Sequence, residues 1–139
     1  MGANKIKLLL IIFTLTFFIG RAQNSYIYIA PMDVTVPYSI SCHNLIDTFK
    51  ESIKKVKLNN KNKEQIHSLI VPLKKMTTKA YTDIRYKGEI YFEKQKIIFC
   101  GDEATISING IDYEMSKELI QYIKTLRSCP SITPAAQSL

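Results

Sequence analysis

The sequence has few of the residues that mark special protein classes. It has five Gly and five Pro among 139 residues, too few for a collagen-like chain or a Pro- and Gly-rich disordered one. Charged residues make up 22% and hydrophobic residues 46%, which excludes a coiled coil and a highly charged disordered chain. The composition is that of one globular domain, which at this length buries roughly two thirds of its unfolded surface without help from a metal.

Motifs for catalysis and cofactor binding are also missing. No phosphate-binding loop, dinucleotide fingerprint, zinc ribbon or nucleophile elbow occurs. Cys42 and His43 are adjacent, so on a helix they point about 100° apart and do not form a nucleophile and its base. His43 and Asp47 supply two metal ligands without a third. We predict no catalytic residue, metal or cofactor; the alternative is a small secreted or periplasmic hydrolase that uses carboxylates.

The longest apolar run lies at the N-terminus. Lys5 and Lys7 precede the run from Leu8 to Ile19, and Gly20 and Ala22 follow it at the spacing of a cleavage site. As a helix the run reaches about 18 Å, well short of a hydrocarbon core of about 30 Å. We therefore predict that residues 1–22 are a cleaved signal peptide; an uncleaved anchor is the alternative.

Export limits the location and the partners of the chain. We expect a periplasmic or extracellular protein with no membrane span after cleavage. Nucleic acid is not expected as a partner, because export removes the protein from the cytoplasm. Residues 130–139 contain two Pro and no charge, and we expect a disordered tail there.

One helix is predicted from Cys42 to Val56. Its apolar residues recur at the spacing of a single helical stripe, and Ser41 precedes them as an N-cap. The stripe consists of Cys42, Leu45, Ile46, Phe49, Ile53 and Val56.

Positive charge is concentrated in the same region. The whole chain has a net charge of +7, and residues 50–79 contain nine Lys against two Glu. Lys50, Lys54, Lys57 and Lys61 fall on one flank of the predicted helix. A solvated helix surface is one interpretation; the other is a binding flank for a protein or an anionic envelope component. The charged face of the strand predicted over 82–92 is the alternative binding surface; it consists of Arg85, Lys87, Glu89 and Glu93.

Two further segments have mixed signals. Residues 24–30 have the aromatic and β-branched content of a strand, and Pro31 indicates an edge strand or an extended arm. Residues 58–63 are predicted to form a polar loop. A helix is predicted from Ile66 until Pro72 ends it, with a strand through Ile70 and Val71 as the alternative.

From residue 82 onward the apolar period changes to two. We predict strands over 82–92, with a bulge at Gly88, and over 97–100, 104–108 and 111–115. Residues 94–96 form the first turn, and Asn109 and Gly110 form a hairpin turn because both tolerate positive φ. Ser116 is the N-cap of a closing helix with an apolar face from Leu119 to Leu126.

The three cysteines are an odd number for an oxidising compartment, so we expect one disulfide and one free thiol. If each element reverses the chain direction, Cys42 and Cys100 lie at one end of the domain and Cys129 at the other. We predict the pair Cys42–Cys100; the other pairings and the absence of a disulfide are the alternatives.

The resulting prediction is an α+β protein with a four-stranded antiparallel meander. Helices cover one of its faces, an extended N-terminal arm precedes it, and residues 23–129 form one domain. Such half-covered sheets commonly bind partners. We expect a small, exported, non-enzymatic binding module, for example an immunity or inhibitor protein.

Overall fold

The computed structural model describes residues 23–79 and 83–130. The predicted signal peptide and the predicted tail beyond Pro130 lie outside these ranges. The elements along the chain are β1 (Ser25–Ile29), α2 (Leu45–Thr48), β2 (Lys54–Leu58), α3 (Asn60–Ile70), β3 (Tyr86–Phe92), β4 (Gln95–Gly101), β5 (Thr105–Ile108), β6 (Ile111–Glu114) and α4 (Lys117–Ser128).

The strands form one antiparallel sheet of six, in the order β2-β1-β3-β4-β5-β6. The α+β class is confirmed, and β3 to β6 are consecutive neighbours, as in a meander. The sheet is larger than predicted, however, because β1 and β2 extend it. The N-terminal segment is neither an arm nor an edge strand: β1 pairs with β2 on one side and β3 on the other, and Pro31 lies two residues after the end of the strand.

The predicted helix from Cys42 to Val56 is wrong. Only Leu45–Thr48 is helical, and Lys54–Leu58 is strand β2. Val56 lies opposite Ile27 and Leu58 opposite Ser25, so pairing with β1 places the apolar side chains of β2 on the core side. Tertiary pairing has overridden the helical period in this segment.

The helix predicted from Ile66 to Pro72 is confirmed as α3, but it starts earlier, at Asn60. Asn59 and Asn62 form a capping box, each side chain accepting from the other's backbone N–H at 2.8 and 3.2 Å. This cap satisfies N–H groups that a helix start otherwise leaves unpaired. The expected polar loop over 58–63 is therefore the end of β2 and the first turn of α3.

Both tight turns of the meander have positive φ at their two central residues. Asn109 and Gly110 have φ values of 49° and 83°, which confirms the predicted hairpin. The turn between β3 and β4 consists of Glu93 and Lys94, with φ values of 46° and 66°. This turn begins one residue before the predicted turn at 94–96. Glu and Lys adopt positive φ less readily than Asn or Gly.

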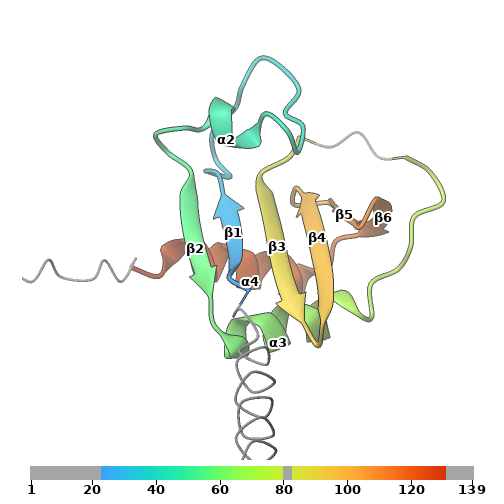
Figure 1. Ribbon diagram of the computed structural model, residues 1–139. Coiled ribbons are helices and arrows are strands. Elements are labelled where there is room, and N and C mark those ends of the chain that lie inside the picture. Colours follow the sequence, from blue (N-terminus) through green and yellow to red (C-terminus); the bar gives the residue numbers. More distant parts are fainter. Residues whose placement is uncertain (1–22, 80–82, 131–139) are drawn as a thin grey trace, which may run out of the picture.

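Helices α3 and α4 lie behind the sheet in the view of Figure 1, and the opposite face is turned toward the reader. The main core lies between these two helices and the sheet. It includes Ile27, Ile29, Ile90, Ile106 and Ile123, each 0% exposed. We call this side of the sheet the covered face. Ser116 is the N-cap of α4, as predicted, and accepts a hydrogen bond from the Leu119 N–H at 3.1 Å.

Gly88 makes room for an aromatic ring on the covered face. It pairs with Ile27 and Phe99 in regular register, so the predicted bulge is absent. A Cβ at this position would lie 2.2 Å from the Phe99 ring, closer than any van der Waals contact. Phe99 thus packs directly over the β3 backbone.

A second, smaller core lies around residues 30–53 at the end of the sheet where α2 lies (Figure 1). Ile40, Leu45 and Phe49 pack there with Ile84 and Cys100. The segment is also held by Arg127, which donates to the carbonyl oxygens of Ile29 at 2.7 Å and Ser52 at 3.4 Å.

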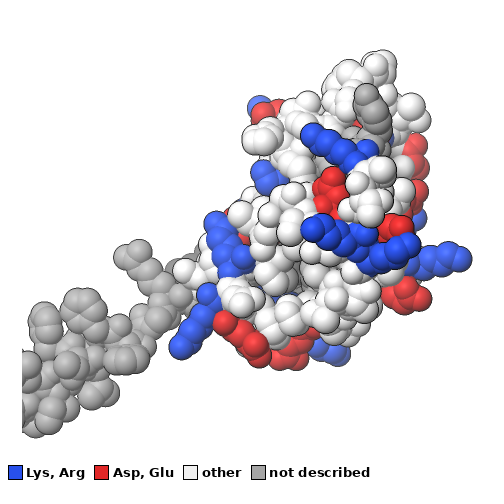
Figure 2. Space-filling model, turned by 90° about the vertical axis from the view of Figure 1, so that its right-hand side faces the viewer, with Lys and Arg blue, Asp and Glu red and all other residues white. Residues whose placement is uncertain are grey.

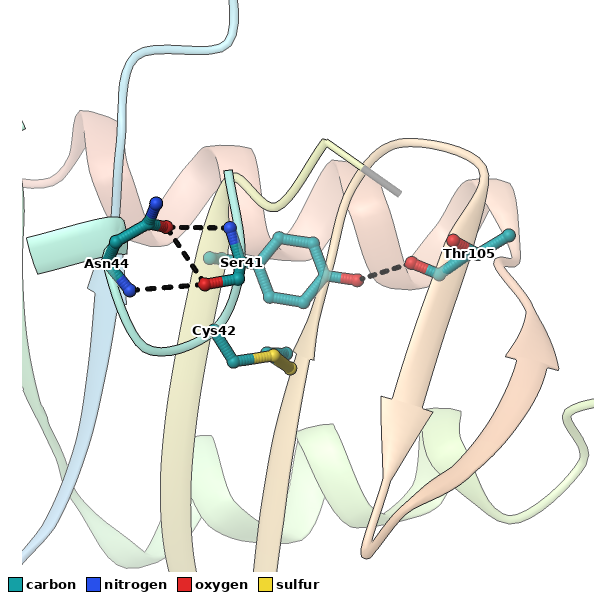
Figure 3. The surroundings of a disulfide bond; sticks show 6 residues. Ser41, Cys42, Asn44 and Thr105 are labelled. Carbon is teal, nitrogen blue, oxygen red and sulfur yellow. Dashed lines mark hydrogen bonds between the residues drawn. A yellow bond between two sulfur atoms is a disulfide. The ribbon is translucent and has the colours of Figure 1, made fainter. Parts of the chain in front are cut away.

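The disulfide between Cys42 and Cys100 is confirmed, with a Cα–Cα distance of 6.1 Å. Cys129 is free and exposed at the end of α4. Figure 3 shows the tight turn beside the disulfide, in which Ser41 N–H donates to Asn44 Oδ1 at 2.7 Å. The predicted pairing is correct although the helix expected to begin at Cys42 is not there, because the 31–53 segment still returns to the sheet end that carries Cys100.

Candidate functional site

The candidate site lies on the sheet face opposite α3 and α4, which we call the open face. The pairing register places three tyrosines and four lysines together there. A shallow groove of about 480 Å³ runs between several of these side chains. We name the set the tyrosine–lysine face; it consists of Tyr26, Tyr28, Lys55, Lys57, Lys87, Glu89, Tyr91 and Lys96.

Strand alternation explains why these side chains share a face. Tyr26 lies opposite Lys57 on one side and Glu89 on the other, and Tyr28 lies opposite Lys55 and Lys87. Directly opposed residues of antiparallel strands project to the same face, where their side chains interact. Each β1 tyrosine is therefore flanked on both sides by a charged side chain.

The Lys55 ammonium group lies over two of the tyrosine rings. Its Nζ is 4.3 Å from the centroid of Tyr26 and 5.4 Å from that of Tyr28. A cation over an exposed ring contributes about 0.5–1 kcal/mol. Among the described residues, no carboxylate lies within 4.0 Å of the Nζ of Lys55, Lys57 or Lys87.

Glu89 is the acidic residue of this face, and its carboxylate already has partners. It accepts a hydrogen bond from the Tyr91 hydroxyl at 2.6 Å and pairs with Lys96 at 2.9 Å. The hydrogen bond from Tyr91, followed by that from Lys96, lowers the pKa of Glu89, and Glu89 in turn raises the pKa of Lys96. The remaining lysines of the face are left with an uncompensated positive charge.

The lysines predicted to form one binding flank are distributed over separate elements. Lys50 lies in the turn after α2, Lys54 begins β2, Lys57 belongs to the tyrosine–lysine face, and Lys61 is in the first turn of α3. Lys54 has a structural contact, because its Nζ donates to the carbonyl oxygens of Arg127, at 2.6 Å, and Cys129. Loss of the predicted helix removes the geometry that would have grouped them.

Sequence reasoning did not select Tyr26, Tyr28, Lys55 or Tyr91 as site residues, although the charged strand face that it offered as an alternative surface includes Lys87 and Glu89. The alternation of tyrosine and isoleucine over residues 26–29 was a usable signal, since it predicts two tyrosines on one strand face. The partner strand β2 was missing from the prediction, so the lysines beside these tyrosines were not placed.

Two other polar side chains have local roles. His67 stacks on Phe92, with ring centroids 4.3 Å apart. Asp102 accepts from the backbone N–H groups of Ala104 and Thr105 at 2.7 and 2.8 Å and so organises the β4–β5 turn. Within residues 23–79 and 83–130, no group of three or more His, Cys, Asp or Glu is arranged to hold a metal ion.

Charges of both signs are mixed on the side of the molecule that carries β5 and β6. Figure 2 views this side and shows lysines and carboxylates next to one another. Two ion pairs lie in this region, Lys74 with Glu114 and Lys124 with Glu103. Lys74 and Lys124 on this side therefore have carboxylate partners, whereas Lys55, Lys57 and Lys87 on the open face have none within 4.0 Å among the described residues.

No helix in the described part of the chain is long and apolar enough to cross a membrane. Comparison with protein-family models, with curated proteins and with solved structures found no match to this chain.

Proposed function

We propose that this chain is an exported, non-enzymatic binding module that docks an acidic protein partner on its tyrosine–lysine face. The observation that carries the proposal is the position of Lys55, whose ammonium group lies over Tyr26 and Tyr28 with no carboxylate partner among the described residues. An acidic side chain of a partner would pair with this cation. The partner's side chains next to that acidic group would pack on the tyrosine rings.

Tyrosine and lysine contribute different parts of such an interaction. Half-buried tyrosines provide large, rigid contact area at low entropic cost, as they do in many protein interfaces. Lysines accelerate encounter with an oppositely charged surface and select against basic partners. A face that combines both fits a partner with carboxylates and apolar groups.

A protein is the favoured partner because the face adjoins a sheet edge. Strand β2, which carries Lys55 and Lys57, is the last strand of the sheet. No described strand pairs with its outer side, which can therefore accept another polypeptide backbone. An anionic polysaccharide or lipid would use the lysines but not that edge.

The disulfide supports the exported part of the proposal. Structural disulfides persist in oxidising compartments such as the periplasm and the extracellular space, and Cys42–Cys100 joins residues 58 positions apart.

The test is an NMR titration with poly-L-glutamate as the acidic polypeptide and polymannuronate as the anionic polysaccharide, at equal charge concentration. We expect poly-L-glutamate to shift the ring signals of Tyr26, Tyr28 and Tyr91 and to bind more tightly than polymannuronate. K55E should weaken binding about tenfold, whereas the matched K117E, in the exposed first turn of α4, should not. Shifts confined to other surfaces, or tighter binding of polymannuronate, would contradict the proposal.

A further inference from the structure

The two edges of the sheet differ in whether another strand can pair with them. The edge strand β6 is covered by residues 74–76: Glu114 N–H donates to the Lys74 carbonyl, and Met76 N–H donates to the Asp112 carbonyl, both at 2.9 Å. Lys75 and Tyr113 form a β-bridge in the same place. The other edge strand, β2, has its one strand partner in β1.

The pairing pattern identifies the backbone groups that β2 presents outward. Ala30 N–H donates to the Arg85 carbonyl at 2.8 Å, so Tyr28–Lys87 and Tyr26–Glu89, two and four positions along the same ladder, are hydrogen-bonded pairs of β1 and β3. The alternate residues of β1 must then bond to β2.

Those alternate residues are Ser25, Ile27 and Ile29, whose partners on β2 are Leu58, Val56 and Lys54. The remaining β2 residues, Lys55 and Lys57, therefore direct their N–H and C=O groups away from the sheet. None of the turn, loop and cap hydrogen bonds of the described residues uses these groups. The same two lysines project their side chains onto the open face, so edge and face meet at these residues.

A groove runs along the β2 edge, on the side of the strand that faces the end of α4. It has a volume of about 620 Å³ and passes between β2 and the end of α4. Val56, Leu58 and Leu126 provide its apolar lining. A strand laid along β2 would point alternate side chains into this groove and the others toward Lys55 and Lys57.

We propose that the partner docks by adding an extended segment to β2 as a seventh strand, with acidic side chains toward Lys55 and Lys57 and apolar side chains toward Val56, Leu58 and Leu126. This inference rests on the proposed function and specifies how its partner binds. Main-chain hydrogen bonds to an edge provide affinity, and the alternating side chains provide specificity.

The lysines of β2 also argue against a second copy of this chain as the added strand. Two β2 strands side by side would bring Lys54, Lys55 and Lys57 of both copies together, and like charges directly opposed across strands are destabilising. Lysines on edge strands block this kind of self-pairing. The same charges favour an acidic segment, so they discriminate between partners.

The test measures amide hydrogen exchange by NMR with a synthetic peptide of about eight residues, roughly the length of a strand, in which glutamate and valine alternate. We expect the peptide to slow exchange of the Lys55 and Lys57 amides at least tenfold. A matched peptide with N-methyl groups on alternate residues keeps the charges but loses the edge hydrogen bonds, and it should bind at least tenfold more weakly. K57P removes an outward N–H without touching the β1 ladder. Compared with K57Q, which loses the same charge but keeps the N–H, it should weaken the first peptide to a similar extent while the rest of the amide spectrum stays unchanged.

Equal affinity of the two peptides, or unprotected Lys55 and Lys57 amides at saturation, would overturn strand addition. If the ring signals of Tyr26 and Tyr28 shift in that same experiment, the acidic ligand lies on the tyrosine–lysine face but does not pair with the β2 edge. The proposed function would then still stand. Binding of poly-L-glutamate combined with no binding of either peptide would also overturn strand addition alone. Pairing of two copies on addition of peptide, detected as a doubled mass in sedimentation, would contradict the partner assigned here.

Discussion

The covered and open faces of the sheet both carry aromatic side chains, but in different surroundings. On the covered face, Phe99 lies against the Gly88 backbone and Tyr86 is 0% exposed. On the open face, Tyr26, Tyr28 and Tyr91 are half-buried beside lysines. Because successive residues of a strand point to opposite faces, one set of strands supplies both a core and an interaction surface.

Burial, rather than residue type, separates the aromatic side chains of the core from those of the interaction surface. Burial raises the pKa of the Tyr86 hydroxyl well above its usual value, with a further contribution from the charge of Asp102. That hydroxyl donates to the Thr105 carbonyl at 3.5 Å (Figure 3). The open-face tyrosines instead contact charged side chains, and Lys55, Lys57 and Lys87 there have no carboxylate partner among the described residues.

The largest effect on stability is expected on the covered face. F99A removes a ring that is 1% exposed and leaves a cavity over Gly88, which should cost about 3–5 kcal/mol in the free energy of unfolding. Y91A on the open face should cost about 1 kcal/mol or less, because that side chain is only half-buried. Denaturant unfolding of the two variants measures the difference, and equal losses would break the comparison.

The disulfide comes next, because it fastens the 31–53 segment to one end of the sheet. C42S combined with C100S should lower the free energy of unfolding by about 2–4 kcal/mol, since the loop is no longer closed in the unfolded chain. C129S is the control and should change it by less than about 0.5 kcal/mol, because that thiol is exposed and free. A loss of similar size in C129S would indicate that the pairing is different.

The smallest effect is a pH dependence on the open face. Because the folded pKa of Glu89 is lowered, its ionised form stabilises the protein at pH values above the ordinary carboxyl pKa, and this contribution is lost as pH falls through the folded pKa. Solvent screening keeps it small, about 0.2–1 kcal/mol for an exposed ion pair. E89Q should therefore be less stable than the wild type at pH 7 and equal to it near pH 2. A constant difference between the two pH values would contradict this assignment.

Local sequence signals predicted the C-terminal half of the fold. Asn109 and Gly110 specify a turn through backbone conformation alone, and Ser116 specifies a helix start through one side-chain hydrogen bond. Such features depend on a few neighbouring residues. They are therefore accessible without knowledge of the tertiary structure.

The N-terminal half depended on long-range pairing. Residues 53–58 have apolar spacings compatible with helix or strand, and contact with β1 decides between them. Pro31 indicates an edge position for β1, and a helix over residues 53–58 leaves β1 without β2 as its neighbour. Lys55 is then not expected beside Tyr26. The prediction included Lys57 of the candidate site but not the tyrosines beside it, because the site is assembled across strands that are distant in sequence.

We propose that the open face binds a partner while the covered face holds the fold together. The most direct measurement compares poly-L-glutamate affinity in two variants with the same loss of charge: K55Q/K57Q/K87Q on the open face and K74Q/K117Q/K124Q elsewhere. At about 0.5 kcal/mol per exposed lysine, the first should bind about tenfold more weakly with nearly unchanged stability, and the second should bind as the wild type does. Equal weakening in both variants would show that net charge, rather than this face, governs binding, and would contradict the account.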